Sequence, residues 1–179
     1  MIDVPEDRCE RHRLFERIDG AFKSGDFDTL AAIFGNDPAW PNQPMPFELG
    51  LGHPLEYAIY WSPVALIAEL IHAGADVNYH DDGGFPSLIA ALSAKRSDRL
   101  DIVRLLVDKG ADVHQRGVND WTPLHYAVSL RDGDAILLLL TAGADPSQRT
   151  RIDDCSTPGE DAGRIGFSVG IELLDRVTR

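Results

Sequence analysis

The sequence contains few cysteines and no long apolar run. Its two cysteines, Cys9 and Cys155, lie near opposite ends of the 179 residues without a partner motif, so we expect plain thiols in a reducing cytoplasm and no disulfide framework. No stretch approaches the ~18 consecutive apolar residues of a membrane span. The first fifteen residues carry mixed charge, unlike a signal peptide. These absences predict a cytoplasmic protein without a membrane anchor.

Basic residues are also scarce. Lysine and arginine total 17 against 29 aspartates and glutamates, which gives a formal net charge of −12 at pH 7. Such a surface repels phosphate backbones and attracts basic proteins. We therefore expect no nucleic-acid partner, whereas a protein with basic groups would be drawn in. The 44% hydrophobic content is ample for a folded core.

The common motifs of catalysis and metal binding are missing as well. The sequence has no Gly-rich loop followed by Gly-Lys-Ser/Thr, no His-Glu-x-x-His and no Cys-x-x-Cys. His80 beside Asp81 and Asp82 could in principle bind a cation, but an exposed turn rarely fixes three ligands. The adjacent carboxylates Asp153 and Asp154 have no burial that would separate their pKa values. We predict no catalytic residue, no cofactor and no metal, and hence no enzyme.

What the sequence does contain is a repeat. Gly-Ala-Asp occurs three times after an apolar run, beginning at Gly74, Gly110 and Gly143, with intervals of 36 and 33 residues. A second phrase precedes each copy: HPLEYA at 53–58, PSLIAA at 86–91 and TPLHYA at 122–127. An insertion of three residues in the middle copy accounts for the longer interval.

The Gly-Ala-Asp phrases are predicted to end helices. Glycine adopts the left-handed conformation that is common just after a helix. An aspartate two residues later can accept hydrogen bonds from backbone N–H groups of the turn. We therefore interpret the phrase as structural rather than catalytic. The aspartates concerned are Asp76, Asp112 and Asp145.

Prolines and capping residues predict where helices begin. Pro54 and Pro123 suit the first turn of a helix, because a proline there loses no backbone hydrogen bond. Thr122 and Asp98 can each cap the helix that follows them, and Ser62 before a proline opens another. Helices are expected near 6–23, 26–35, 54–61, 63–73, 87–96, 99–109, 123–130, 134–142, 158–165 and 168–177.

The second helix of each repeat is apolar on most sides, as in ALIAELIHAG, DIVRLLVDKG and AILLLLTAG. This pattern predicts that each of these helices is sandwiched between neighbouring repeats.

These motifs resemble ankyrin repeats, whose pattern of about 33 residues runs D-x-x-G-x-T-P-L-H-x-A and ends its second helix in L-L-x-x-G-A-D-V-N. The resemblance covers residues 53–147, and the segments 21–42 and 156–177 look like degenerate first and last repeats. It implies an all-α fold, an ankyrin-repeat α-solenoid of about five helix-turn-helix repeats with short β-hairpin-like loops. The chain is also similar to small stand-alone ankyrin-repeat proteins of bacteria.

The resemblance further implies one domain over 1–179. Its expected parts are an N-terminal capping repeat at 6–42, repeats at 50–78, 79–114 and 115–147, and a C-terminal capping repeat at 148–179. In ankyrin repeats the histidine of T-P-L-H commonly hydrogen-bonds within and between loops, which implies a structural role for His125.

In proteins of this family the partner usually binds the concave side, formed by the hairpin tips and the inner helices. Carried onto this chain, the expected partner-binding residues are Tyr60, Trp61, His80, Asp82, Phe85, Ser93, Arg116, Val118, Asn119, Trp121, Ser129 and Leu130, with Ala94 beside them. The four aromatic residues would form a hydrophobic anchor strip, because aromatic side chains dominate interface energetics. The acidic rim would consist of Asp81, Asp82 and Asp120.

Alternative placements remain for several of these side chains. Trp61 packs beneath the loop at 40–54, or lies exposed; Phe85 folds inward, or lies exposed; Trp121 is expected to be exposed. A basic cluster at the three-residue insertion is expected to be solvated. It consists of Lys95, Arg96 and Arg99.

Three functions are compatible with these residues. The first is a monomeric, non-enzymatic protein-protein interaction module that binds a partner with apolar and basic surface. The second is a cytoplasmic immunity-type inhibitor that occludes a toxin or enzyme, with acidity suited to a basic target such as a nuclease. The third, which has the least support, is an enzyme or metal-binding protein built on a repeat frame.

Overall fold

The computed structural model describes residues 4–35, 37–46, 52–79, 83–152 and 154–177. Within these residues the chain forms ten α-helices and one short 3-10 turn, and no strand. The fold is thus the all-α ankyrin-repeat fold that the repeat motifs imply. The chain divides into two compact units, Met1–Tyr79 and His80–Arg179.

The helices agree closely with those expected from the sequence. Unit 1 contains α1 (Arg8–Ser24), α2 (Phe27–Phe34), α3 (Pro54–Trp61) and α4 (Val64–His72). Unit 2 contains α5 (Ser87–Ser93), α6 (Arg99–Asp108), η2 (Val118–Asp120), α7 (Pro123–Ser129), α8 (Gly133–Thr141), α9 (Pro158–Arg164) and α10 (Ser168–Asp175). Helix ends lie within two residues of their predicted positions, except that α5 ends three residues early.

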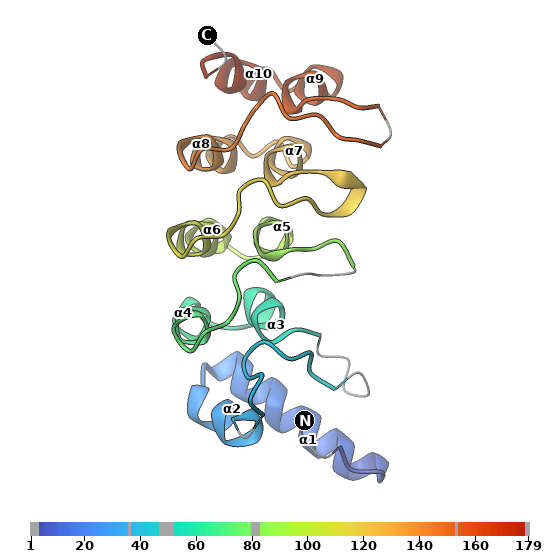
Figure 1. Ribbon diagram of the computed structural model, residues 1–179, viewed down its shortest axis with the longest axis vertical. Helices are drawn as coiled ribbons and strands as arrows, with labels where there is room; N and C mark the ends of the chain where they lie inside the picture. The colour runs from blue at the N-terminus through green and yellow to red at the C-terminus, as the bar shows by residue number, and fades with distance from the viewer. Residues whose placement is uncertain (1–3, 36, 47–51, 80–82, 153, 178–179) are drawn as a thin grey trace. The chain divides into compact units, whose positions relative to one another are not determined.

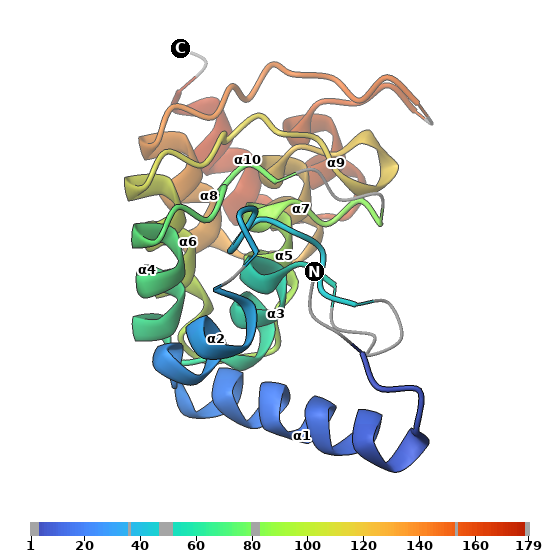
Figure 2. The same cartoon turned by 60° about the horizontal axis from the view of Figure 1, so that its bottom comes forward.

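Unit 1 is built on the apolar side of α1, which runs alongside α2 and α3 (Figure 2). Ile18 and Phe22 of α1 are fully buried, and the ring of Phe22 lies 4.9 Å from that of Tyr57 on α3. The hydroxyl of Tyr57 donates a 2.5 Å hydrogen bond to Asp19, one residue beyond Ile18. Burial and the neighbouring Asp19 carboxylate raise the pKa of Tyr57 well above its ordinary value, so this donor stays protonated.

In unit 2 the first helices of successive repeats pack against one another. Figure 1 shows α5, α7 and α9 beside the projecting loops, with α6, α8 and α10 on the other side. We refer to the first helix of each repeat, α5, α7 and α9 here and α3 in unit 1, as an inner helix, and to the second, α6, α8 and α10 here and α4 in unit 1, as an outer helix. Helix α7 contacts both α5 and α9, and Ala91 and Ala127 are fully buried at these close approaches. Small side chains therefore set the spacing of the inner helices.

The ends of the outer helices confirm the predicted role of the Gly-Ala-Asp phrase. Gly74, Gly110 and Gly143 have φ angles of 102°, 90° and 93°, in the left-handed region. The aspartate of each phrase accepts a 2.8 Å hydrogen bond from the backbone N–H two residues later. The turn is therefore made by local backbone geometry at all three places.

The helix starts follow the predictions in part. The Thr122 side chain accepts a hydrogen bond from the backbone N–H of His125, as expected of a cap. The prediction for Asp98 is wrong: it makes no capping bond, because Arg96 binds its carboxylate at 2.6 and 2.7 Å. Ser62 does not cap α4 either, and its buried hydroxyl has no partner among the described residues.

The three-residue insertion follows α5, which ends at Ser93 and has seven residues, as α7 does. Ala94 leaves the helix with φ −63° and ψ 124°, an extended conformation, and is buried. The basic cluster at this insertion is not simply solvated as predicted. Arg96 binds Asp98, and Arg99 binds Asp132 at the start of α8, which leaves Lys95 as the exposed member. The first of these ion pairs is local to the loop, and the second links α6 to the start of α8 in the next repeat.

None of the described helices is both long enough and apolar enough to cross a lipid bilayer.

Candidate partner-binding surface

The largest exposed aromatic side chain lies at the end of α3 in unit 1. Trp61 is 58% exposed and therefore does not pack beneath the 40–54 loop, one of the two placements considered from the sequence. The ammonium group of Lys23 lies 5.8 Å from its ring centroid, within the range of a cation–π contact. Tyr60, the residue before it, is half-buried. We call Tyr60 and Trp61 the unit 1 patch.

Leu130 in unit 2 occupies the same place in its repeat as Trp61. Each follows the proline that opens its inner helix, Pro54 or Pro123, by seven residues. Leu130 is 44% exposed, a large value for leucine. In the middle repeat this place falls on Ala94, which is buried. The structure thus presents an exposed large apolar side chain at the end of α3 and of α7, a buried alanine at the end of α5 and the half-buried Ile165 at the end of α9.

Leu130 continues a row of apolar side chains along α7. The rings of Trp121 and Tyr126 meet edge to face with centroids 6.2 Å apart. Leu130 lies one turn beyond Tyr126, four residues on, and so shares its face of the helix. Trp121 is half-buried by this contact, so it is less accessible than Trp61 and not the most exposed ring. We call Trp121, Tyr126 and Leu130 the unit 2 patch.

The loop before α7 holds Val118 and Asn119 beside this patch. The N–H of Val118 donates to the carbonyl of Gly84 at 2.7 Å, and Gly117 donates to the carbonyl of Trp121 at 2.9 Å. A Cβ atom on Gly84 would lie 2.8 Å from the backbone nitrogen of Val118, so this close approach requires glycine. Asn119 is exposed, with a φ of 57° that asparagine tolerates well.

Asp120 does not supply the exposed acidic rim that the sequence suggested. Its side chain is only 9% exposed and is bound by Arg116 at 2.7 Å and by Arg151 at 2.5 Å. It also accepts the backbone N–H of Arg151 at 2.6 Å. The hydrogen bond from Arg151 is the main reason that the pKa of Asp120 is lowered. This carboxylate is therefore ionised and neutralised within the protein.

Arg116 is occupied in the same way. Besides Asp120, its guanidinium donates to the carbonyl of Arg149 at 2.9 Å in the next loop. Arg149 in turn binds Glu160 of α9 at 2.7 and 2.9 Å. This chain of charges joins successive loops of unit 2, and a partner would compete with internal bonds to reach Arg116.

The other predicted contact residues vary in accessibility. Phe85 is half-buried, and the Ser93 hydroxyl donates to the carbonyl of Ala90 at 2.8 Å. Ser129 is exposed and its hydroxyl bonds the carbonyl of Tyr126 at 2.7 Å. The predicted residues His80 and Asp82, together with Asp81, lie outside the described residues.

His125 has the structural position that the resemblance implied. Its Nδ1 lies 2.8 Å from the Thr122 hydroxyl, and its Nε2 lies 3.1 Å from the carbonyl of Ser156 in the next repeat. Since a carbonyl only accepts, Nε2 carries the proton and Nδ1 accepts from Thr122. Burial lowers the pKa of His125, which keeps the ring neutral. The residue links two repeats and is not available to a substrate.

Among the residues that the structure describes, no group of three or more histidine, cysteine, aspartate and glutamate side chains is placed to hold a metal ion.

Sequence reasoning missed two members of this surface. Tyr126 could have been found from its four-residue spacing to Leu130 on a predicted helix. Lys23 could not, because it reaches Trp61 from a helix 38 residues earlier in the chain.

Comparison with known proteins agrees with this architecture. A sequence model of ankyrin repeats, in three copies, matches residues 55–150. Palmitoyltransferase Hip14 of Drosophila melanogaster is 29% identical over 79% of this chain and 21% of its own length. Protein phosphatase 1 regulatory subunit 27 of Mus musculus is 49% identical over 34% of this chain and 40% of its own length.

A viral relative shows the same kind of partial similarity. Putative ankyrin repeat protein L271 of Acanthamoeba polyphaga mimivirus is 37% identical over 53% of this chain and 12% of its own length. The chain thus matches between 12% and 40% of the length of these three relatives. Because the ankyrin-repeat match spans more than half of the residues, and the helix pairs and Gly-Ala-Asp turns lie where it requires them, the chain belongs to the ankyrin-repeat family.

Proposed function

We propose that the protein is a non-enzymatic protein-protein interaction module that binds its partner through the hairpin loops and inner helices. Ankyrin repeats bind other proteins, so the family membership supports the general role. On this proposal each unit contributes its own contacts, the unit 1 patch in one and the unit 2 patch in the other. The predicted residues Phe85, Ser93, Val118, Asn119 and Ser129 would supply the surroundings of these anchors.

The observation that carries the proposal is the recurrence of an exposed large apolar side chain at one place in the repeat. Trp61 and Leu130 end their inner helices with 58% and 44% of their surfaces exposed. Exposing such side chains gains the isolated protein nothing, whereas burying them in an interface is favourable. Their position supports a partner that contacts the ends of the inner helices.

Charge supports a partner with basic as well as apolar groups. The chain carries a formal net charge of −12, which accelerates association with a basic surface and opposes association with nucleic acid or with a second copy of itself. We accordingly propose a cytoplasmic monomer that meets a basic protein. Because Asp120 is neutralised internally, this attraction arises from the whole surface rather than from an acidic rim at Trp121.

The alternative is an inhibitor of the immunity type, which would occlude a single toxin or enzyme. One relative is by name a regulatory subunit of a protein phosphatase, which supports control of an enzyme by a chain of this kind. Partner number and affinity separate the two functions. An inhibitor would hold one partner with a nanomolar dissociation constant, whereas a general interaction module would hold several more weakly.

The experiment is affinity capture from the native cell with the wild type and the variants Trp61→Ala and Leu130→Ala. Each variant is expected to weaken capture of the partner about tenfold or more, since removal of an interface anchor costs ~2 kcal/mol. Val177→Ala serves as the matched control, because Val177 is 54% exposed and lies outside both patches. If all captured proteins survive both substitutions as well as they survive the control, the proposed surface is wrong.

The enzymatic or metal-binding reading has its own test. Metal analysis of the purified protein with one zinc or calcium ion per chain would contradict the proposed function.

A further inference from the structure

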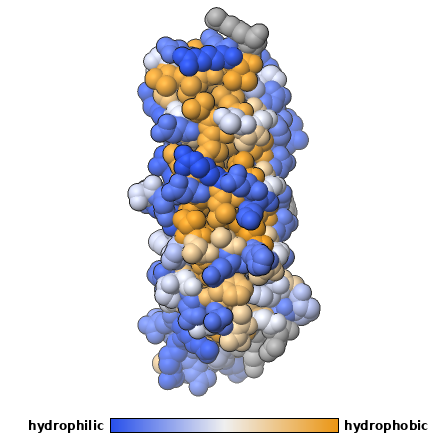
Figure 3. Space-filling view, turned by 90° about the vertical axis from the view of Figure 1, so that its left-hand side faces the viewer, coloured by the Kyte–Doolittle hydropathy of each residue, from blue (hydrophilic) through white to orange (hydrophobic). Residues whose placement is uncertain are grey.

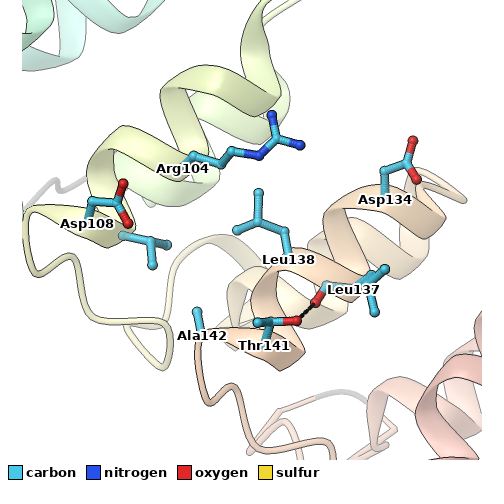
Figure 4. Close-up of a pocket in the computed structure, with 8 residues that line it drawn as sticks. Arg104, Asp108, Asp134, Leu137, Leu138, Thr141 and Ala142 are labelled. Carbon is cyan, nitrogen blue, oxygen red and sulfur yellow. Dashed lines mark hydrogen bonds between the residues drawn. The ribbon is translucent and has the colours of Figure 1, made fainter.

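Unit 2 contains an open groove on the side away from the loops, between the outer helices α6 and α8 (Figure 4). Its volume is about 590 Å³. It is lined by Arg104, Val107 and Asp108 of α6 and by Asp134, Leu137, Leu138 and Thr141 of α8 with Ala142. The inner helices α5 and α7 pack against each other, so this groove is a property of the outer layer alone.

The α8 side of the groove is apolar and exposed. Helix α8 buries Ala135, Ile136 and Leu139 in the core, which turns Leu137 outward with 54% of its surface exposed. The expectation that this helix is sandwiched on most sides is therefore wrong for Leu137. Figure 3 faces the outer helices and shows apolar side chains in a band along this side, with polar ones flanking it. The core of the unit therefore does not bury all four consecutive leucines of α8.

The groove is also acidic. Arg104 donates a 2.8 Å hydrogen bond to Asp101 one turn earlier, so its charge is compensated within α6. Asp108 and Asp134 are exposed, and neither has an ion-pair partner within the part of the chain that the structure describes. Figure 4 places these two carboxylates on opposite sides of Leu138. The groove thus offers an apolar floor with a negative charge at each margin.

Asp108 is placed where a negative charge is unfavourable. It is the last residue of α6, and the carboxyl end of a helix carries a partial negative charge. The last turn of α6 contains no basic residue, and the exposed Lys109 at the C-cap is the basic group next to it. A cation brought by another molecule would interact favourably with both the carboxylate and the helix end.

We propose that this groove is a second docking site, which binds an amphipathic helix of a partner through leucine-like residues on one face and lysine or arginine at its edges. A space between two neighbouring helices accepts the side-chain ridge of a third helix, with contacts every three to four residues. The two acidic margins select basic flanking residues. A second copy of this chain would bring acid against acid, and its net charge of −12 would oppose the approach.

The test uses a labelled synthetic peptide of about 18 residues, five helical turns, in which leucine repeats at helical spacing among lysines. Fluorescence anisotropy with the full chain is expected to give saturable binding with a micromolar dissociation constant. Leu137→Gln, which keeps a good helix former, should raise that constant about tenfold. The double variant D108N/D134N should raise it several-fold and flatten its dependence on salt.

Matched controls separate docking from nonspecific attraction. Val177→Gln changes a side chain of equal exposure outside the groove and should leave the constant unchanged. A scrambled peptide of the same composition should bind at least tenfold more weakly, and a leucine–glutamate peptide should not bind. Amide chemical shifts should move in α6 and α8 rather than in the unit 1 or unit 2 patch, so this site stands or falls separately from the proposed function.

Several results would overturn the proposal. These are the absence of saturable binding, an equal effect of L137Q and V177Q, or shifts confined to residues outside α6 and α8. Sedimentation that showed a wild-type dimer dissociated by L137Q would assign the groove to a second copy of the chain instead.

Discussion

At the scale of single residues, the same residue type has different effects according to its surroundings. Asp120 accepts two guanidinium groups and a backbone N–H while only 9% of its side chain is exposed. Asp101 binds a single arginine, Arg104, one turn away on the surface of α6. Removing one partner from a nearly buried charge network lowers the free energy of unfolding far more than removing one partner from an exposed ion pair.

Asp120→Ala is therefore expected to lower the free energy of unfolding by about 2–4 kcal/mol, because it leaves Arg116 without its carboxylate and removes the acceptor of a backbone N–H. Asp101→Ala, the exposed control, should cost less than about 1 kcal/mol. Urea unfolding followed by circular dichroism measures both. Equal costs for the two variants would show that the Asp120 network adds no stability.

His125 predicts a dependence of stability on pH. Burial lowers its pKa in the folded state below the ordinary value of 6.5, so the unfolded chain binds a proton first as the pH falls. The stabilisation of the folded state by the neutral ring is fully present above about pH 6.5 and is lost progressively below that pH. The wild type should thus unfold at lower urea concentration at pH 5.5 than at pH 7.5.

His125→Gln retains a side-chain donor but does not titrate, so it should reduce this loss between pH 7.5 and 5.5. Carboxylates with lowered pKa values, such as those of Asp120 and Asp145, titrate below this interval and do not mask the effect. A variant that kept the full wild-type slope would assign the effect to another group.

At the scale of elements, glycine conformation decides where helices end. Gly143 closes α8 at a φ of 93°, and no atom lies within 4 Å of the place a Cβ would take. Gly163 lies within α9 and is equally uncrowded. The two positions therefore isolate backbone conformation from side-chain packing.

Gly143→Ala is expected to destabilise unit 2 by about 1–2 kcal/mol, the cost of a left-handed conformation for an ordinary residue. Gly163→Ala should stabilise it by up to about 1 kcal/mol, because alanine favours a helix that glycine weakens. Thermal unfolding of the two variants gives the comparison. Shifts of the same sign would contradict the conformational explanation.

The elements were largely predictable from sequence, since each boundary depends on a local signal. Pro54, Thr122 and Gly143 fix helix ends by rules that involve only their near neighbours. Asp98 was wrongly assigned as a cap because Arg96, two residues away, binds its carboxylate more strongly than the helix end does. A capping rule does not include such competition.

The candidate surface was predictable to a smaller extent, because exposure depends on contacts between distant residues. The exposure of Trp61 depended on whether the 40–54 loop covered it. The neutralisation of the Asp120 carboxylate depended on Arg151, which lies 31 residues later in the chain. The alternation of inner and outer helices was evident from the repeat. The groove on the outer side was not, because the apolar sequence of α8 suggested a helix sandwiched between repeats on most sides.

At the scale of the whole molecule, the net charge opposes the self-association that exposed apolar side chains favour. The formal charge of −12 at pH 7 keeps copies apart, although Trp61, Leu130 and Leu137 are each at least 44% exposed. The isoelectric point near 4.7 marks the pH at which this repulsion disappears.

Self-association should therefore increase as the pH is lowered from 7.5 towards 4.7, because protonation of carboxylates removes the repulsion that opposes apolar contact. Light scattering at constant salt measures it. The combined variant with Trp61→Ala and Leu137→Gln should scatter less than the wild type at pH 5. Equal scattering would show that other surfaces drive the association.

The residue that follows each inner helix has a consequence for partner choice. Helices α5 and α7 each have seven residues, but the next residue is the buried Ala94 after α5 and the exposed Leu130 after α7. The side chain at this one position therefore decides which repeat offers an apolar contact, and a substitution there would change the contacts of one repeat while the adjacent repeats keep theirs.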